Sequence, residues 1–206
     1  MTEQHCVIVG ASHAAASLAA TLRQDGWEGR ITLVGDEPHA PYHRPPLSKA
    51  YLSGDKDADS LAIRPADFYA AQNIELRPGA RVERIDRDAR CVFLDDGSSL
   101  SYSKLALTTG ALPRHVNLPG TELAGVHYLR NIADVDAIRQ QVAAGKSAVI
   151  VGGGYIGLET AASLRAAGMQ VTVLEAMSRV LQRVTAPGVS GFFNRIHSEE
   201  GVSILT

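Results

Sequence analysis

The sequence lacks paired cysteines and any long apolar run. Its two cysteines, Cys6 and Cys91, lie far apart in apolar strand-like segments, so neither a CxxC redox pair nor a metal cluster is indicated. We expect both to be buried thiols, and we expect no bound metal. No apolar run approaches the about 20 residues that cross a bilayer, and the N-terminus shows no signal peptide. These absences predict a cytoplasmic protein without a membrane contact.

An excess of charge of one sign is also missing. The sequence holds 20 basic and 22 acidic residues, which give a formal net charge of -2 and no basic patch for a nucleic-acid partner. Hydrophobic residues make up 45% of the chain, as in ordinary globular proteins. Its 206 residues can form one large or two small domains.

Alternating strand and helix signals predict an α/β fold. We expect a strand at 7–9, a helix at 14–25 and a strand at 31–34, followed by a proline-rich loop at 36–49 that is a site rather than a spacer. The further expected elements are a helix at 65–72, strands at 74–76 and within 80–88, 90–96 and 105–110, helices at 132–144 and 187–199, a strand–loop–helix–strand unit at 146–176 and a strand at 201–206. The loop-like stretch 113–125 marks a domain boundary, which gives domains 1–113 and 114–206.

One βαβ unit occurs twice in this chain. Residues 7–26 align with 149–168 without a gap, and nine of the twenty positions are identical: Val7, Ile8, Val9, Gly10, Ala19, Ala20, Leu22, Arg23 and Gly26. In the second copy, Gly152, Gly154 and Gly157 form a GxGxxG motif directly after the expected strand and before the expected helix. Such a motif in this context predicts dinucleotide binding.

The three motif positions serve different purposes. The first glycine makes the tight turn, the second lets a pyrophosphate approach the backbone, and the third brings the helix against the strand. In the first copy Gly10 keeps the turn, while Ser12 and Ala15 replace the other two glycines. Both replacements are small, so we expect this loop to bind a dinucleotide phosphate as well.

An acidic residue follows the second strand of each unit. Glu175 stands 18 residues beyond Gly157, where a carboxylate accepts ribose hydroxyls and repels a 2′-phosphate, which favours NADH over NADPH. In the first copy the candidate is Asp36, with Glu37 as a possible substitute.

Two further segments give the sequence a family resemblance. The stretches "PYHRPPLSKAYL" and "LALTTGALPR", which follow the first unit, make the chain similar to the flavin-dependent ferredoxin and rubredoxin reductases. The resemblance covers essentially the whole chain. It implies two Rossmann-like units of the pyridine nucleotide-disulphide oxidoreductase type, both incomplete at the C-terminus, with FAD in domain 1–113 and NADH in domain 114–206.

The resemblance also assigns roles to single residues. It implies that Arg44 lies near the ribose and diphosphate of FAD and Lys49 near its isoalloxazine, where an ammonium stabilises the charge of the reduced flavin. Glu159 would pair with Lys49, and we expect these two residues to be catalytic. Tyr155 would guard the nicotinamide pocket. The alternatives are exposed loop cations, a helix-surface acid and a core tyrosine, respectively.

The cofactor sites expected in this way comprise both loops and the segments around them. For FAD they are Gly10, Ser12, His13, Ala14, Ala15, Asp36, Glu37, Arg44, Lys49, Val82, Thr109, Gly110 and Arg114, and for NADH they are Gly152, Gly154, Tyr155, Ile156, Gly157, Glu159 and Glu175.

The implied activity is electron transfer from NADH through FAD to an iron–sulfur ferredoxin or rubredoxin. The redox cysteines of related disulfide reductases are missing after the first acidic strand end, so electrons are expected to leave through the flavin itself. Members of this group continue well beyond residue 206, and we expect an N-terminal portion of a reductase that alone binds FAD weakly or not at all and turns over poorly. The alternative is a non-catalytic nucleotide-binding or interaction module. The sequence does not indicate an oligomeric state.

Overall fold

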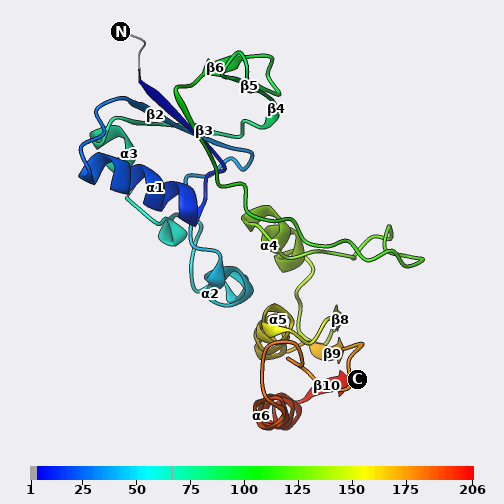
Figure 1. The fold of residues 1–206 in the computed structure, drawn as a ribbon. Helices are drawn as coiled ribbons and strands as arrows, with labels where there is room; N and C mark the ends of the chain where they lie inside the picture. The colour runs from blue at the N-terminus through cyan, green and yellow to red at the C-terminus, as the bar shows by residue number, and fades with distance from the viewer. Residues whose placement is uncertain (1–3, 66) are drawn as a thin grey trace. The chain divides into compact units, whose positions relative to one another are not determined.

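The computed structural model describes residues 4–65 and 67–206, which form two compact units (Figure 1). The first unit contains the chain up to residue 43 together with residues 59–112. The second contains residues 44–58 and 113–206, so the proline-rich loop expected at 36–49 is divided between the units: residues 36–43 belong to the first and residues 44–49 to the second. The assignment of one domain to FAD and the other to NADH stays a prediction.

The first unit is built on a parallel sheet with the strand order β3-β2-β1-β7. Its strands are β1 (His5–Val9), β2 (Arg30–Gly35), β3 (Ile74–Pro78) and β7 (Lys104–Leu107), and α1 (His13–Gln24) connects β1 to β2. All pairings within this sheet are parallel. The predicted α/β fold class is therefore confirmed for this unit.

The two faces of this sheet carry different layers. Side chains alternate along β1, so that Ile8 packs with Ala15 and Ala19 of α1, whereas Val7 and Val9 pack with Val92 of a second sheet. That sheet is antiparallel and consists of β4 (Val82–Asp86), β5 (Cys91–Leu94) and β6 (Ser99–Ser101). Figure 1 shows it on the side of the main sheet that faces away from α1.

Several details of the first unit differ from the expectations. The short strand β6 was missed, and it is the strand that follows the Asp96–Gly97 turn. The helix expected at 65–72 is only α3 (Phe68–Ala71), preceded by the single turn η2 (Asp59–Leu61); Ala66 lies outside the described residues. Cys6 is buried as expected, but Cys91 is only partly buried, so that expectation was wrong.

The second unit repeats the same core arrangement. Its parallel sheet has the order β10-β9-β8 and consists of β8 (Ser147–Val151), β9 (Gln170–Leu174) and β10 (Val202–Leu205). The helix α5 (Tyr155–Ala166) connects β8 to β9, and α6 (Pro187–Glu199) precedes β10. The predicted strand–helix–strand repeat is therefore present in both units.

Three shorter helices complete the second unit. They are η1 (Pro45–Ser48), α2 (Ala50–Ser53) and α4 (Ile132–Arg139). A capping box formed by Asn131 and Asp134 starts α4. This helix was expected to reach residue 144, but it ends at Arg139 because the following amides form tight i→i+3 turns, from Gln141 to the Ile138 carbonyl and from Val142 to the Arg139 carbonyl.

An arginine ties each repeat to its third strand. The guanidinium of Arg23 donates to the Asn73 carbonyl at 2.7 Å, just before β3. Its counterpart Arg165 donates to the Glu200 carbonyl at 2.9 Å, just before β10. The two arginines that are identical in the alignment therefore make the equivalent hydrogen bond in both copies.

The counterparts of the first unit's buried valines lie open in the second. Val7 is 0% exposed, whereas its counterpart Val149 is 63% exposed. Strand β8 is an edge of its sheet, and no antiparallel sheet covers it within the described part of the second unit. No helix among the described residues is long and apolar enough to span a membrane.

Candidate functional site

The first loop makes its turn at a glycine that no other residue can replace easily. Gly10 has a φ of +102°, and a Cβ built on it would lie 2.2 Å from the Thr108 carbonyl oxygen. Its amide donates to the Val34 carbonyl at 2.8 Å, which joins the end of β1 to the end of β2. Both the backbone conformation and the close approach of the Thr108 backbone therefore require glycine here.

The second motif position of the first loop does not require glycine. Ser12 is the N-cap of α1 with an extended backbone, φ -134°, which a serine adopts without strain. The first helical hydrogen bond runs from the Ala16 amide to the Ser12 carbonyl at 2.9 Å. The helical hydrogen-bond ladder therefore starts at the Ala16 amide, and the first turn of α1 follows the loop directly, in the position where helix N-termini bind anions.

The second loop has the same backbone turn, and its tightest contact is at the third motif position. Gly152 has a φ of +113°, and its amide donates to the Leu174 carbonyl at 2.7 Å, as Gly10 does in the first copy. Gly154 is the N-cap of α5, and a Cβ there would meet open space. At Gly157 a Cβ would lie 2.0 Å from the Gly152 carbonyl oxygen, so only glycine allows α5 to begin so close to β8.

The side chain of Glu175 binds backbone amides of the second loop and of the segment after β9. Its carboxylate accepts the Gly153 amide at 2.8 Å and the Met177 amide at 2.9 Å. A carboxylate has about four acceptor positions, so two bonds leave capacity for the hydroxyls of a ribose. The predicted acid therefore lies beside the loop, at the end of β9.

Two acidic residues follow β2 in the first unit, and their side chains have different neighbours in the structure. Glu37 accepts a hydrogen bond of 2.5 Å from the Tyr42 hydroxyl. Asp36 is exposed, and its carboxylate lies 3.8 Å from the guanidinium of Arg81. Asp36, the first choice of the sequence reasoning, is therefore the acid that faces solvent at the end of β2.

Lys49 and Glu159 form the predicted ion pair. The Lys49 ammonium lies 2.6 Å from the Glu159 carboxylate, although the two residues are more than a hundred positions apart. The same carboxylate oxygen accepts the Ser48 hydroxyl at 2.6 Å. Ser48 is 3% exposed, and its carbonyl accepts the Ser163 hydroxyl at 2.8 Å, so both partners of Glu159 are positioned by α5 and η1.

Sequence reasoning missed Ser48 as part of this cluster. A serine flanked by a predicted catalytic lysine carries no signal of its own, because its contact with Glu159 depends on the packing of η1 against α5. The pairing of Lys49 with Glu159 was implied by the resemblance and is present. Their catalytic roles stay a prediction.

The remaining predicted residues are placed as follows. Arg44 donates to the Arg130 carbonyl at 2.8 Å. Tyr155 is 49% exposed, and its place beside the nicotinamide stays a prediction. Val82 packs beside the buried cluster around Val92 in the first unit.

The predicted sites divide between the two units. The first unit contains the predicted FAD residues Gly10, Ser12, His13, Ala14, Ala15, Asp36, Glu37, Val82, Thr109 and Gly110. The second contains the predicted NADH residues and also Arg44, Lys49 and Arg114.

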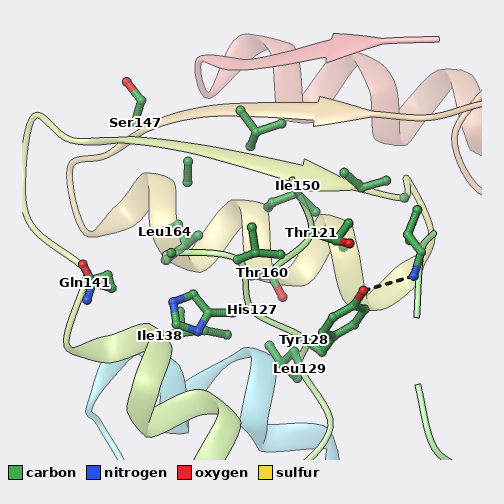
Figure 2. Close-up of a pocket in the computed structure, with 18 of the residues that line it drawn as sticks. Thr121, His127, Tyr128, Leu129, Ile138, Gln141, Ser147, Ile150, Thr160 and Leu164 are labelled. Atoms are coloured by element: carbon green, nitrogen blue, oxygen red, sulfur yellow. Dashed lines mark hydrogen bonds between the residues drawn. The ribbon is translucent and has the colours of Figure 1, made fainter. Parts of the chain in front are cut away.

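A cavity of about 810 Å³ lies in the second unit, between the segment before α4 and the outer face of β8 (Figure 2). Its lining is mainly apolar, with Leu129, Ile138, Ile150 and Leu164 among the contributing side chains. The hydroxyl of Tyr128, drawn in the figure with its hydrogen bond, is already engaged by the Val116 amide at 3.0 Å. This apolar space does not suit a diphosphate.

Comparison with known proteins gives consistent matches. The sequence fits the pattern of the pyridine nucleotide-disulphide oxidoreductase family over residues 4–206. It is 48% identical over 203 residues to putidaredoxin reductase of Pseudomonas putida, which covers 97% of this chain and 48% of that protein. It is 47% identical over 196 residues to rhodocoxin reductase of Rhodococcus erythropolis, covering 95% of this chain and 46% of the relative.

Solved structures agree with these matches. A ferredoxin reductase from Rhodopseudomonas palustris superposes with a TM-score of 0.94 at 42% identity, over 98% of this chain and 50% of that one. A putidaredoxin reductase in covalent complex with putidaredoxin superposes with a TM-score of 0.91 at 48% identity, over 100% of this chain and 50% of that one. The chain spans about half the length of the curated relatives it matches.

Proposed function

The chain belongs to the pyridine nucleotide-disulphide oxidoreductase family, and from this premise we propose that the whole protein is an NADH-dependent flavoprotein reductase of a ferredoxin or rubredoxin. In this proposal the first unit holds FAD and the second holds NADH. A cytoplasmic location is part of the same proposal.

The names of the relatives support the proposal that the electron acceptor is an iron–sulfur protein. Two of the most similar proteins are reductases of putidaredoxin and rhodocoxin, and one solved relative is joined covalently to putidaredoxin. We propose an iron–sulfur protein of this class as the partner here. Which one, and which oxygenase it serves, is not part of the proposal.

The residues of both loops fit dinucleotides. Gly10 and Gly152 both turn the chain with a positive φ just before the N-terminus of a helix, and a helix N-terminus is a favourable position for the diphosphate of a dinucleotide. Asp36 and Glu175 supply carboxylates for ribose hydroxyls. When bound, FAD accepts hydride from the nicotinamide and passes on single electrons.

The ion pair of Lys49 and Glu159 carries the catalytic part of the proposal. Lys49 supplies a positive charge that stabilises negative charge developing on a nearby acceptor. Glu159 and the buried Ser48 hold that ammonium in one place, since Glu159 is bound to both at 2.6 Å. The side chain of Lys49 is 48% exposed, so its charge remains available to a ligand.

The proposal is tested by flavin reduction. We expect Lys49→Ala and Glu159→Gln to slow the anaerobic reduction of bound FAD by NADH about a hundredfold, because each change removes or releases the positioned charge. FAD retention, measured by flavin absorbance after gel filtration, should change much less. Lys56→Ala, which removes an exposed cation from the same unit, is the matched control.

Three results would count against the proposal. Parental reduction rates in both variants would remove Lys49 and Glu159 from the mechanism. A whole protein that retains FAD but is not reduced by NADH would favour the non-catalytic nucleotide-binding module. A whole protein that takes up no FAD at all would contradict the assignment of the first loop.

A further inference from the structure

Helix α5 binds Ser48 at two atoms. The Ser48 hydroxyl donates to the Glu159 carboxylate at 2.6 Å, and the Ser48 carbonyl accepts the Ser163 hydroxyl at 2.8 Å. Glu159 and Ser163 stand four positions apart in α5, so they lie one above the other on the same face of the helix. Ser48 is 3% exposed, so water has little access to these bonds. One turn of α5 therefore fixes both the hydroxyl and the carbonyl of Ser48.

Lys49 follows Ser48 directly in the chain, so the two bonds to Ser48 also fix where the lysine side chain starts. The Lys49 ammonium lies 2.6 Å from the same Glu159 oxygen that accepts the Ser48 hydroxyl, and it donates to the Pro45 carbonyl at 3.1 Å. Pro45 and Pro46 begin η1, and their fixed φ angles stiffen this turn. The ammonium therefore has one partner in η1 and one in α5, and the position of η1 against α5 determines where it lies.

The Ser163 hydroxyl is directed away from its own helix. Inside a helix, a serine or threonine hydroxyl often bonds the carbonyl four positions earlier. Thr160 of α5 does so, since its hydroxyl donates to the Ile156 carbonyl at 2.8 Å. The Ser163 hydroxyl donates to the Ser48 carbonyl instead. This bond therefore joins α5 to a segment that lies more than a hundred positions earlier in the chain.

These contacts give Ser163 a role that the sequence did not indicate. We propose that Ser163 is a positioning residue: by binding the Ser48 carbonyl it keeps η1 against α5, and thereby keeps the Lys49 ammonium at the Glu159 carboxylate. Ser163 acts through these residues and not on the reacting atoms. The catalytic consequence of this inference rests on the proposed function, whereas the position of the ammonium can be measured without any cofactor.

The first experiment measures how fast acetic anhydride acetylates Lys49 in the full chain without FAD or NADH, by mass spectrometry of its peptides. A lysine side chain bound to a carboxylate must break that contact before it reacts, so the ion pair protects Lys49. The exposed Lys56 in the same unit is the internal reference. We expect Ser163→Ala to raise the labelling rate of Lys49 relative to that of Lys56 by about three- to tenfold, because one neutral hydrogen bond is lost. Ser163→Thr keeps the hydroxyl and should leave the parental ratio.

Two control variants and a rate measurement complete the test. Glu159→Gln removes the charge of the carboxylate and should raise the Lys49 labelling at least as much as Ser163→Ala does. Ser198→Ala removes a serine from the exposed surface of α6 and should leave the labelling unchanged. In the whole protein, Ser163→Ala should slow the reduction of bound FAD by NADH about three- to tenfold. It should cause no further slowing in a Lys49→Ala background, because both changes act through the same ammonium.

The outcomes separate this inference from the proposed function. The role of Ser163 is overturned, and the reductase proposal left intact, by an unchanged Lys49 ratio in Ser163→Ala, by a raised ratio that Ser163→Thr does not restore, or by an equal rise at Lys146. The same holds if Ser163→Ala slows flavin reduction equally with and without Lys49. A raised Lys49 ratio together with a parental reduction rate in Lys49→Ala supports the role of Ser163 and overturns the catalytic part of the proposed function.

Discussion

Replacing Glu75 should weaken the first unit in a strongly pH-dependent way. The Glu75 carboxylate accepts hydrogen bonds from Arg30 at 2.6 Å, from Arg77 at 2.8 Å and from Thr32 at 2.9 Å. Burial raises the pKa of this carboxyl, but the bonds from Arg77, Arg30 and Thr32 outweigh it and lower the pKa from 4.5 to about 2. The folded state therefore favours the ionised form.

The size and direction of the effect follow from that difference. If solvent screening is neglected, the change in the pKa of Glu75 corresponds to about 3 kcal/mol of stability. The Glu75 side chain is 32% exposed, so screening reduces this to about 1–2 kcal/mol. Because the folded pKa is depressed, this stabilisation is present above about pH 4.5 and is lost as pH falls toward 2. Glu75→Gln should therefore cost about 1–2 kcal/mol at neutral pH, about half as much near pH 3 and little near pH 2.

The assay uses the single tryptophan of the chain. Trp27 packs against the core cluster of the first unit, so its fluorescence during urea unfolding reports on that unit rather than on the whole chain. Glu83→Gln, on the exposed surface of β4, is the control and should change the unfolding midpoint very little at any pH. An equal loss of stability at neutral pH and near pH 2 would refute the linkage, and so would no loss at neutral pH.

Three further predictions concern the repeated unit. Val7→Ala should cost about 2 kcal/mol of unfolding free energy, whereas Val149→Ala should cost less than about 0.5, because the first side chain is 0% and the second 63% exposed; urea unfolding followed by circular dichroism tests this. Gly157→Ala should weaken NADH binding at least about tenfold, measured by nicotinamide fluorescence, because its Cβ would meet the Gly152 carbonyl. Glu175→Gln should lower the preference for NADH over NADPH, and an unchanged ratio of dissociation constants would argue against Glu175 as the ribose acceptor.

Much of the fold could be predicted because the sequence contains an internal repeat, so that one copy of the βαβ unit can be compared with the other. The nine identities between 7–26 and 149–168 identify the strand, turn and helix of each copy, and the structure places both copies in parallel sheets. Arg23 and Arg165 could be recognised as equivalent from this alignment. Their acceptors before β3 and β10 could not, because those carbonyls lie in segments that the alignment does not include.

The features that were missed depend on long-range packing or on very short elements. Strand β6 has only three residues and carries no hydrophobic periodicity that would separate it from a turn. The end of α4 at Arg139 is set by turns in an alanine-rich segment whose helix propensity favours continuation. Ser48 joins the ion pair of Lys49 and Glu159 only because η1 and α5 pack together.

The two loops show which glycines the backbone requires and which a ligand requires. Gly10 and Gly152 both have positive φ, so the first position is fixed by the turn in either copy. At the second position Ser12 and Gly154 both have ordinary backbone conformations, so glycine there leaves room for a ligand rather than relieving strain.

The residue that fits at the third motif position depends on how closely each helix approaches its strand. Gly157 cannot carry a Cβ, whereas Ala15 does so while fully buried, so α1 begins with more room than α5. The first loop thereby keeps its amide donors while gaining the hydroxyl of Ser12 and the imidazole of His13. The second loop presents Gly154 and Tyr155 at these positions. If the first loop holds FAD and the second NADH, as proposed, these side chains are the difference between the loops that distinguishes the two dinucleotides.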